Sequence, residues 1–239
     1  MRRVYLFGLI LMFLLSSAAI AVAYETSGVS PEAALKMLQE GNGRFVSAAV
    51  KRLNQNAKQR VQTAEKGQKP FASVLSCADS RVPVEVIFDR GIGDIFVVRD
   101  AGNIATQTDI GSIEYAVDHL GTNLVVVLGH SKCGAVTAAV GGGEAPPNIK
   151  AIVDFIAPAV TTAKTASPDK SGDALVSAAI TANVWQAMAD MYKNSPMMRD
   201  KVKDGKIKLV GAVYDLKSGK VNWMGPHPQQ AQLVAGEAK

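Results

Sequence analysis

The fold of this chain is decided by two segments, Phe71-Ala-Ser-Val-Leu-Ser-Cys77-Ala-Asp79-Ser-Arg81 and Leu124-Val-Val-Val-Leu-Gly-His130-Ser-Lys-Cys133. Each begins with an apolar run of strand length and ends in polar or sulfur-bearing side chains. Open α/β sheets carry their sites at the carboxyl ends of the strands. The two segments therefore predict parallel strands whose ends bring both cysteines and His130 together.

Cys77, His130 and Cys133 form a candidate set of metal ligands. Two thiolates and an imidazole suit Zn²⁺, which takes four ligands and keeps one position open when it is catalytic. Asp79 is close enough in sequence to be a fourth ligand or to orient a bound water. The alternative is that both cysteines are ordinary core residues and that His130 caps the helix that follows.

The apolar runs predict an α/β fold with a central, mostly parallel β-sheet flanked by helices. Between the second and third runs, apolar residues recur at helical spacing and stop at Gly121, which indicates a βαβ crossover. The turn Lys217-Ser218-Gly219 predicts that the last strand returns antiparallel at the sheet edge. The predicted strands are residues 71–76, 95–98, 124–128, 207–214 and 220–224.

Helices are predicted before and after the sheet-forming segments. The first begins with Ser30 as N-cap and Pro31 at its first position, and Gly41 is expected to end it. The polar stretch 47–65 is expected on the surface or against a partner. Two helices follow the loop 141–147, Ser195-Pro196 starts a short one, and no structure is expected after Gly225.

The first 23 residues have the features of a signal peptide. Arg2 and Arg3 precede an apolar run from Val4 to Leu15, and Ala21-Val-Ala23 is a small-residue cleavage site. The apolar run is shorter than the roughly 20 residues of a spanning helix, although an uncleaved anchor is the alternative. We therefore expect one domain, residues 24–239, that is periplasmic or secreted and has no stable membrane insertion after cleavage.

The cysteine count agrees with a metal site in such a compartment. The chain has two cysteines, and both are candidate ligands. Secreted chains usually use cysteines in disulfides, so a bond between Cys77 and Cys133 is the alternative in a metal-free chain.

Charge argues against nucleic acid as a partner. The formal net charge is +5, and removal of Arg2 and Arg3 with the leader leaves +3. Basic and acidic residues are interleaved, as in residues 198–206, so no polybasic patch is formed.

These segments, taken in order, closely resemble the β-class carbonic anhydrases. The likeness runs from about Pro31 to Met224, and it is specific because ligand types, their order and the segments between them agree together. The matching stretches are Lys69-Pro-Phe71 through Arg81-Val-Pro83, Gly93-Asp-Ile-Phe-Val-Val-Arg99, Ala101-Gly-Asn103, Ile113-Glu-Tyr-Ala116 and Gly129-His-Ser-Lys-Cys-Gly134. The resemblance implies one zinc ion per subunit, reversible hydration of carbon dioxide to bicarbonate, and a homodimer or a higher assembly.

Asp79 and Arg81 are the predicted catalytic dyad. Asp79 can accept a hydrogen bond from a zinc-bound hydroxide and orient it toward the substrate, while Arg81 can hold that carboxylate at two points. Without this spacing, Arg81 would be interpreted as an ordinary surface charge.

The substrate pocket follows from the resemblance alone. It implies that Gln68 donates an amide hydrogen to the substrate, that Phe96 and Ala101 are apolar walls, and that Tyr115 is contributed across a dimer interface. By periodicity, Phe96 and Tyr115 would be core residues. Asp100 departs from the family pattern, in which an asparagine or an apolar residue is expected.

Two alternative functions remain open at the level of sequence. The same metal site is compatible with hydrolysis of carbonyl sulfide or carbon disulfide. If Asp79 closes the coordination sphere permanently, the chain is a non-catalytic zinc-binding protein.

Overall fold

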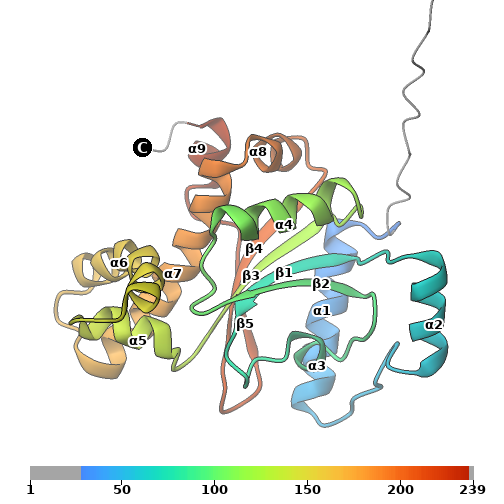
Figure 1. Ribbon diagram of the computed structural model, residues 1–239, viewed down its shortest axis with the longest axis horizontal. Coiled ribbons are helices and arrows are strands. Elements are labelled where there is room, and N and C mark those ends of the chain that lie inside the picture. Colours follow the sequence, from blue (N-terminus) through green and yellow to red (C-terminus); the bar gives the residue numbers. More distant parts are fainter. Residues whose placement is uncertain (1–27, 237–239) are drawn as a thin grey trace, which may run out of the picture.

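A five-stranded sheet in the order β2-β1-β3-β4-β5 forms the centre of the computed structural model, which describes residues 28–236 (Figure 1). Neighbouring strands are parallel except for the antiparallel edge pair β4 and β5. The predicted sheet is confirmed, with ends that differ by one or two residues. The predicted leader, residues 1–23, lies outside the described part. The strands are β1 (Ala72–Cys77), β2 (Ile95–Asp100), β3 (Leu124–His130), β4 (Lys208–Tyr214) and β5 (Val221–Gly225).

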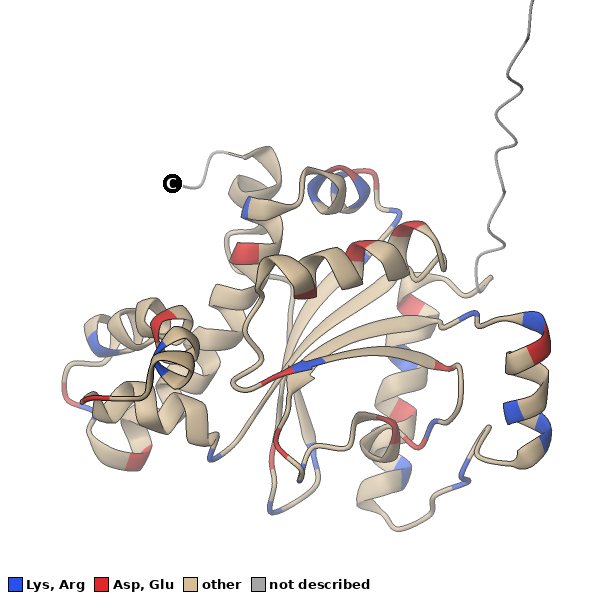
Figure 2. Cartoon of the chain, in the orientation of Figure 1, with Lys and Arg blue, Asp and Glu red and all other residues tan. Residues whose placement is uncertain are grey.

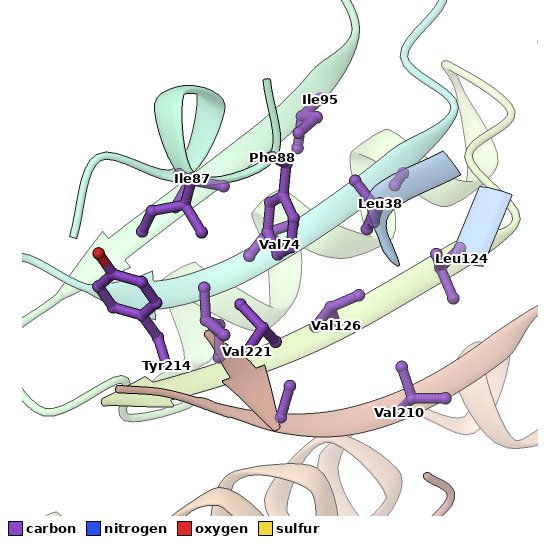
Figure 3. Packing of buried hydrophobic residues seen from close by; sticks show 14 of the residues in the cluster. Leu38, Val74, Ile87, Phe88, Ile95, Leu124, Val126, Val210, Tyr214 and Val221 are labelled. Atoms are coloured by element: carbon purple, nitrogen blue, oxygen red, sulfur yellow. The ribbon is translucent and has the colours of Figure 1, made fainter. Parts of the chain in front are cut away.

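Alternating side chains of the strands supply two apolar layers, one on each face of the sheet. Val74, Val126 and Val210 pack with Leu38 and Phe88 on one face, which α1 (Pro31–Val46) and α3 (Val84–Ile87) cover (Figure 3). The opposite face is covered by α4 (Gln107–Asp118), α7 (Gly172–Asn194), α8 (Pro196–Lys203) and α9 (Gln230–Ala235). The sheet is therefore buried on both sides, as its continuous apolar strands require.

A third apolar cluster lies beyond the carboxyl end of β1. It is built by α5 (Gly134–Gly141), α6 (Pro147–Ala166) and α7, which group together at one side of the molecule (Figure 1). Ile156 and Ile180 are buried in it together with Cys77 and Cys133. The two cysteines thus lie where the sheet meets this helical group.

The first helix starts as predicted but does not end at Gly41. Ser30 accepts a hydrogen bond from the Ala33 amide, and α1 continues to Val46. A Cβ atom at position 41 would lie 1.9 Å from the Phe88 carbonyl oxygen. The glycine therefore permits close packing of α1 against the chain after α3 and is no stop signal.

The prediction for the C-terminal tail was also wrong. Residues after Gly225 form α9, and Leu233 is buried against α7 and α8 in the apolar layer described above. A helix of 6 residues is too short to show an apolar period in the sequence.

The helix α2 (Ala57–Lys66) lies away from the sheet at the edge of the molecule and contains no buried residue (Figure 1). Charged residues of both signs are interleaved along the elements (Figure 2). Within residues 28–236, no helix combines the length and apolar character needed to span a membrane.

Substitution of Gly41 by alanine is expected to destabilise the fold by about 1–3 kcal/mol, because the new methyl group overlaps the Phe88 carbonyl. Gly43, on the same helix, has no atom within 4 Å of an added Cβ. Gly43→Ala should therefore stabilise by up to about 1 kcal/mol through helix propensity. Urea unfolding of both variants measures the difference, and equal effects would contradict this account of Gly41.

Candidate metal centre

Cys77, His130 and Cys133 converge at one buried point. Cys77 ends β1, His130 ends β3, and Cys133 is the N-cap of α5. One potential ligand atom from each lies within 4.8 Å of the other two. All three residues are buried, His130 completely. The structure therefore brings together the three residues that the sequence predicted as metal ligands.

The orientation of His130 leaves one ring nitrogen for a metal. Its Nδ1 lies 2.9 Å from the Ser131 carbonyl oxygen, which can only accept, so Nδ1 carries the proton and donates. The lone pair is then on Nε2, which is buried and has no hydrogen-bond partner. Metal-binding histidines are commonly held in this way by a carbonyl on the other nitrogen.

The two thiols lie close enough for each to affect the ionisation of the other. The pKa of Cys77 is lowered to about 4, against the effect of burial, by a hydrogen bond from the Cys133 thiol and by two backbone amides. The pKa of Cys133 is raised by that same hydrogen bond and by burial. A divalent cation between them would let both sulfur atoms ionise, as zinc binding requires.

Backbone amides reinforce the Cys77 position. The Gly102 amide donates to Cys77 Sγ at 3.2 Å, and the Asp79 amide does so at 3.4 Å. Gly102 has a φ of +82°, and a Cβ atom there would lie 2.7 Å from the Ile156 side chain. This loop position therefore requires glycine for both conformation and space.

Arg81 grips the Asp79 carboxylate at both oxygens. Its Nε donates to Oδ1 at 2.9 Å and its terminal nitrogen to Oδ2 at 2.7 Å, while its backbone amide also donates to Oδ1 at 2.9 Å. These bonds, led by the Arg81 side chain, hold the pKa of Asp79 well below its ordinary value. Oδ2 lies 3.8 Å from His130 Nε2. The carboxylate thus lies beside the His130 ligand atom while being held by the arginine.

Arg99, which the sequence analysis did not select, fixes the backbone of the same turn. It donates to the carbonyl oxygens of Cys77, at 3.0 Å, and Asp79, at 2.7 Å. A single arginine next to a strand end carries no local signal for this role, because its partners are backbone atoms 20 or more residues away.

Three of the four residues predicted to contact substrate, Gln68, Phe96 and Tyr115, do not gather around this cluster. Ala101 precedes Gly102 and lies at the metal end of the sheet. Gln68 is exposed and precedes β1, so roughly 20 Å of strand separate it from Cys77 within the subunit. Phe96 pairs in register with Ser73, near the start of β1, and its ring lies 6.3 Å from that of Tyr115.

Asp100 lies at the metal end of β2, opposite Cys77 in the strand register. Burial and a hydrogen bond to Asp109 raise its pKa to about 6. Asp109 itself accepts hydrogen bonds from the amide and hydroxyl of Thr106, in the capping box that begins α4. The carboxyl groups of Asp100 and Asp109 therefore lie close together, and protonation of Asp100 relieves the repulsion between them.

The sequence model of the carbonic anhydrase family matches residues 72–221, which include every residue of the cluster and the Asp79–Arg81 pair. The chain belongs to the carbonic anhydrase family. Carbonic anhydrase 2 of Mycobacterium tuberculosis is 38% identical over 195 residues, covering 80% of this chain and 91% of that protein. The carbonic anhydrase of Mycolicibacterium smegmatis is 37% identical over 196 residues, covering 80% and 92%.

Solved structures give the same family and its β class. A structure from work on two tetrameric β-carbonic anhydrases of Sordaria macrospora matches with a TM-score of 0.63 at 27% identity, covering 71% of this chain and 89% of that one. A β-carbonic anhydrase of Aspergillus fumigatus matches in fold, with a TM-score of 0.68 at 22% identity and coverage of 87% and 98%. The predicted fold class is therefore confirmed. The donor set and the unpartnered His130 nitrogen also fit the zinc ion of this family.

Replacement of Asp100 by asparagine is expected to stabilise the protein at pH 8 and to do so about half as much at pH 5. The folded pKa of about 6 exceeds the ordinary value of 3.8, so the stability contributed by protonated Asp100 is complete below about pH 4 and lost above pH 6. Allowing for solvent screening, we expect a gain in Tm of roughly 2–4 °C at pH 8. Thermal unfolding at both pH values, with exposed Asp169→Asn as control, measures it. A gain that does not depend on pH would contradict this.

Proposed function

We propose that this protein catalyses the reversible hydration of carbon dioxide to bicarbonate and a proton. The observation that carries the proposal is the convergence of Cys77, His130 and Cys133 beside a carboxylate held by Arg81. Membership of the carbonic anhydrase family supports it. Two thiolates and one imidazole would hold one zinc ion per subunit and leave a fourth position open.

When bound, zinc would supply a hydroxide near neutral pH by acidifying its water. Asp79 would orient the water that provides this hydroxide. Asp79 Oδ2 accepts one hydrogen bond from Arg81 and lies toward His130 Nε2, so it retains an acceptor position on the open side of the cluster. A water on that side can donate to it and keep a lone pair for the substrate carbon.

Arg81 keeps Asp79 in this accepting role. With the carboxylate released, an oxygen already 3.8 Å from the His130 nitrogen is close enough to become a fourth protein ligand. Four protein ligands are the arrangement of a structural zinc site. We therefore propose that the pair acts as a gate, with the arginine grip as its open state and higher pH favouring that state because hydroxide competes for the metal.

Arg81→Ala is expected to retain zinc but to lower carbon dioxide hydration about 10- to 100-fold across the pH range. Cys133→Ala should lose both metal and activity, since it removes a ligand. Elemental analysis and stopped-flow hydration assays separate the two variants. Near wild-type turnover by Arg81→Ala would reject the gate, and a zinc-loaded wild type without hydration activity would reject the enzymatic function.

We further propose that two copies of the chain complete each substrate pocket. Gln68, Phe96 and Tyr115 lie toward the far end of β1 and β2 from the cluster of their own subunit. Tyr115 is 49% exposed although it is a large aromatic side chain. In a twofold dimer these residues can approach the partner's metal centre. The tetrameric β-carbonic anhydrases of Sordaria macrospora are consistent with such an assembly.

The exposed helix α2 offers the second copy an apolar surface that the subunit itself leaves uncovered. Val61 on α2 is 50% exposed, and Ile92, which contacts Gln59 of the same helix, is 39% exposed. Residues 50–66, which include α2, form an arm that hydrogen bonds hold in place. Gln59 donates to the Ile92 carbonyl, and Asn54 donates to the Asp94 carboxylate. A rigid arm loses little conformational entropy when it docks.

Mixed assemblies test the shared pocket directly. Gln68→Ala and Cys133→Ala should each be nearly inactive alone, but co-expression should restore about one quarter of wild-type activity, because half of randomly formed dimers then contain one intact site. Arg81→Ala with Cys133→Ala is the matched control, since both residues belong to the metal end of one subunit, and it should restore nothing. Equal results from the two mixtures would show that Gln68 does not act across a dimer.

We also propose a periplasmic or secreted location, supported by the charged, apolar and small-residue segments of residues 1–23. Mass spectrometry of the native protein should find a first residue near Tyr24. Intact residues 1–23 on the purified protein would contradict this location.

A further inference from the structure

A buried asparagine on α7 is linked to the metal centre through the backbone. Asn183 is 2% exposed and lies on the face of α7 that also carries Ala179, Ile180 and Val184, all buried. Its Nδ2 donates to the Gly102 carbonyl oxygen at 2.7 Å. A polar side chain is costly to bury among apolar neighbours unless it is hydrogen-bonded, and the bond to Gly102 meets that requirement for the Asn183 amide.

Gly102 links Asn183 to Cys77, a predicted zinc ligand, through its two backbone polar groups. Its amide donates to Cys77 Sγ at 3.2 Å while its carbonyl accepts from Asn183, so both polar groups of one residue are used. The residue has φ +82°, and glycine has the widest choice of backbone conformations. A hydrogen bond that fixes its carbonyl therefore also limits where its amide can point.

We propose that Asn183 is a positioning residue for the metal centre, which holds the Gly102 amide on the Cys77 sulfur. This inference rests on the proposed zinc site. An amide that donates to a thiolate withdraws negative charge from the sulfur, so the sulfur donates less charge to a bound metal. A site with two thiolates needs this compensation more than a site of neutral imidazoles does. The asparagine thus acts on the metal through the backbone and touches neither metal nor substrate.

Asn183→Leu and Asn183→Ala test the proposal in the full mature protein. Leucine keeps the approximate size without the donor, and alanine removes both. Both variants should bind zinc about 10-fold more weakly in competition with a chelator, as expected when an outer partner of a ligand is lost. In the cobalt-substituted protein, the sulfur-to-cobalt charge-transfer band should move to longer wavelength, because the thiolate becomes a stronger donor.

Asn42 provides a matched control for loss of a buried asparagine. It is 5% exposed, donates to the carbonyls of Ile87 and Gly219, and accepts from the Val221 amide, all at the other face of the sheet. Asn42→Leu should lower the Tm but leave the zinc affinity and the cobalt band of the folded protein unchanged. A purely structural role for Asn183 would give this same pattern.

The zinc affinity and the cobalt band together decide whether Asn183 positions the metal centre or has a purely structural role. Unchanged zinc affinity and an unchanged cobalt band in folded Asn183 variants would overturn the proposal, even if their Tm falls. Failure of both variants to fold would also overturn it, since the asparagine would then be a structural residue. A wild-type protein that binds no zinc would instead refute the proposed function, which distinguishes the two failures.

Discussion

Three soft donor atoms buried within 4.8 Å of one another impose the main constraint on this molecule. The His130 ring nitrogen among them is buried without a hydrogen-bond partner, which is unfavourable in an apolar interior unless a cation binds it. The parallel sheet makes the meeting possible, because β1 and β3 are adjacent and end at the same edge. The helical group α5 to α7 then closes over that edge and excludes water from the sulfur atoms.

Polar groups around the cluster hold Cys77 and Asp79 in place through hydrogen bonds. Arg81 holds the Asp79 carboxylate, Arg99 holds the backbone carbonyls of the same turn, and the Gly102 amide reaches the Cys77 sulfur. Each contact fixes an atom of Cys77 or of Asp79. The ligands are therefore held in place by groups from β2, its following loop and α7, and the geometry depends on the whole carboxyl edge of the sheet.

The sequence predicted the features that leave a local pattern. Strand-length apolar runs, a crossover with helical spacing and a glycine-bearing turn identified the sheet, and two strand ends identified Cys77 and His130. Features that depend on contacts between distant segments were missed. Gly41 has the same sequence signature as a helix stop, and its close approach to the Phe88 carbonyl exists only in three dimensions. Asn183 likewise lies in an apolar helical stripe, and its partner is 81 residues away.

Gln68 and Phe96 lie far from the metal cluster of their own subunit, although the family resemblance assigns both to the substrate pocket. Both lie toward the amino end of parallel strands, whereas the metal ligands lie at or beyond the carboxyl end. No rotation of a side chain spans the length of a strand. The arm of residues 50–66, which leads to Gln68, is nevertheless held in place. The Asp89 carboxylate accepts hydrogen bonds from the backbone amides of Lys51 and Arg52 and from the Arg44 side chain. In the proposed dimer, the same sheet would serve two sites, with its carboxyl edge holding one metal and its amino end forming the wall of another.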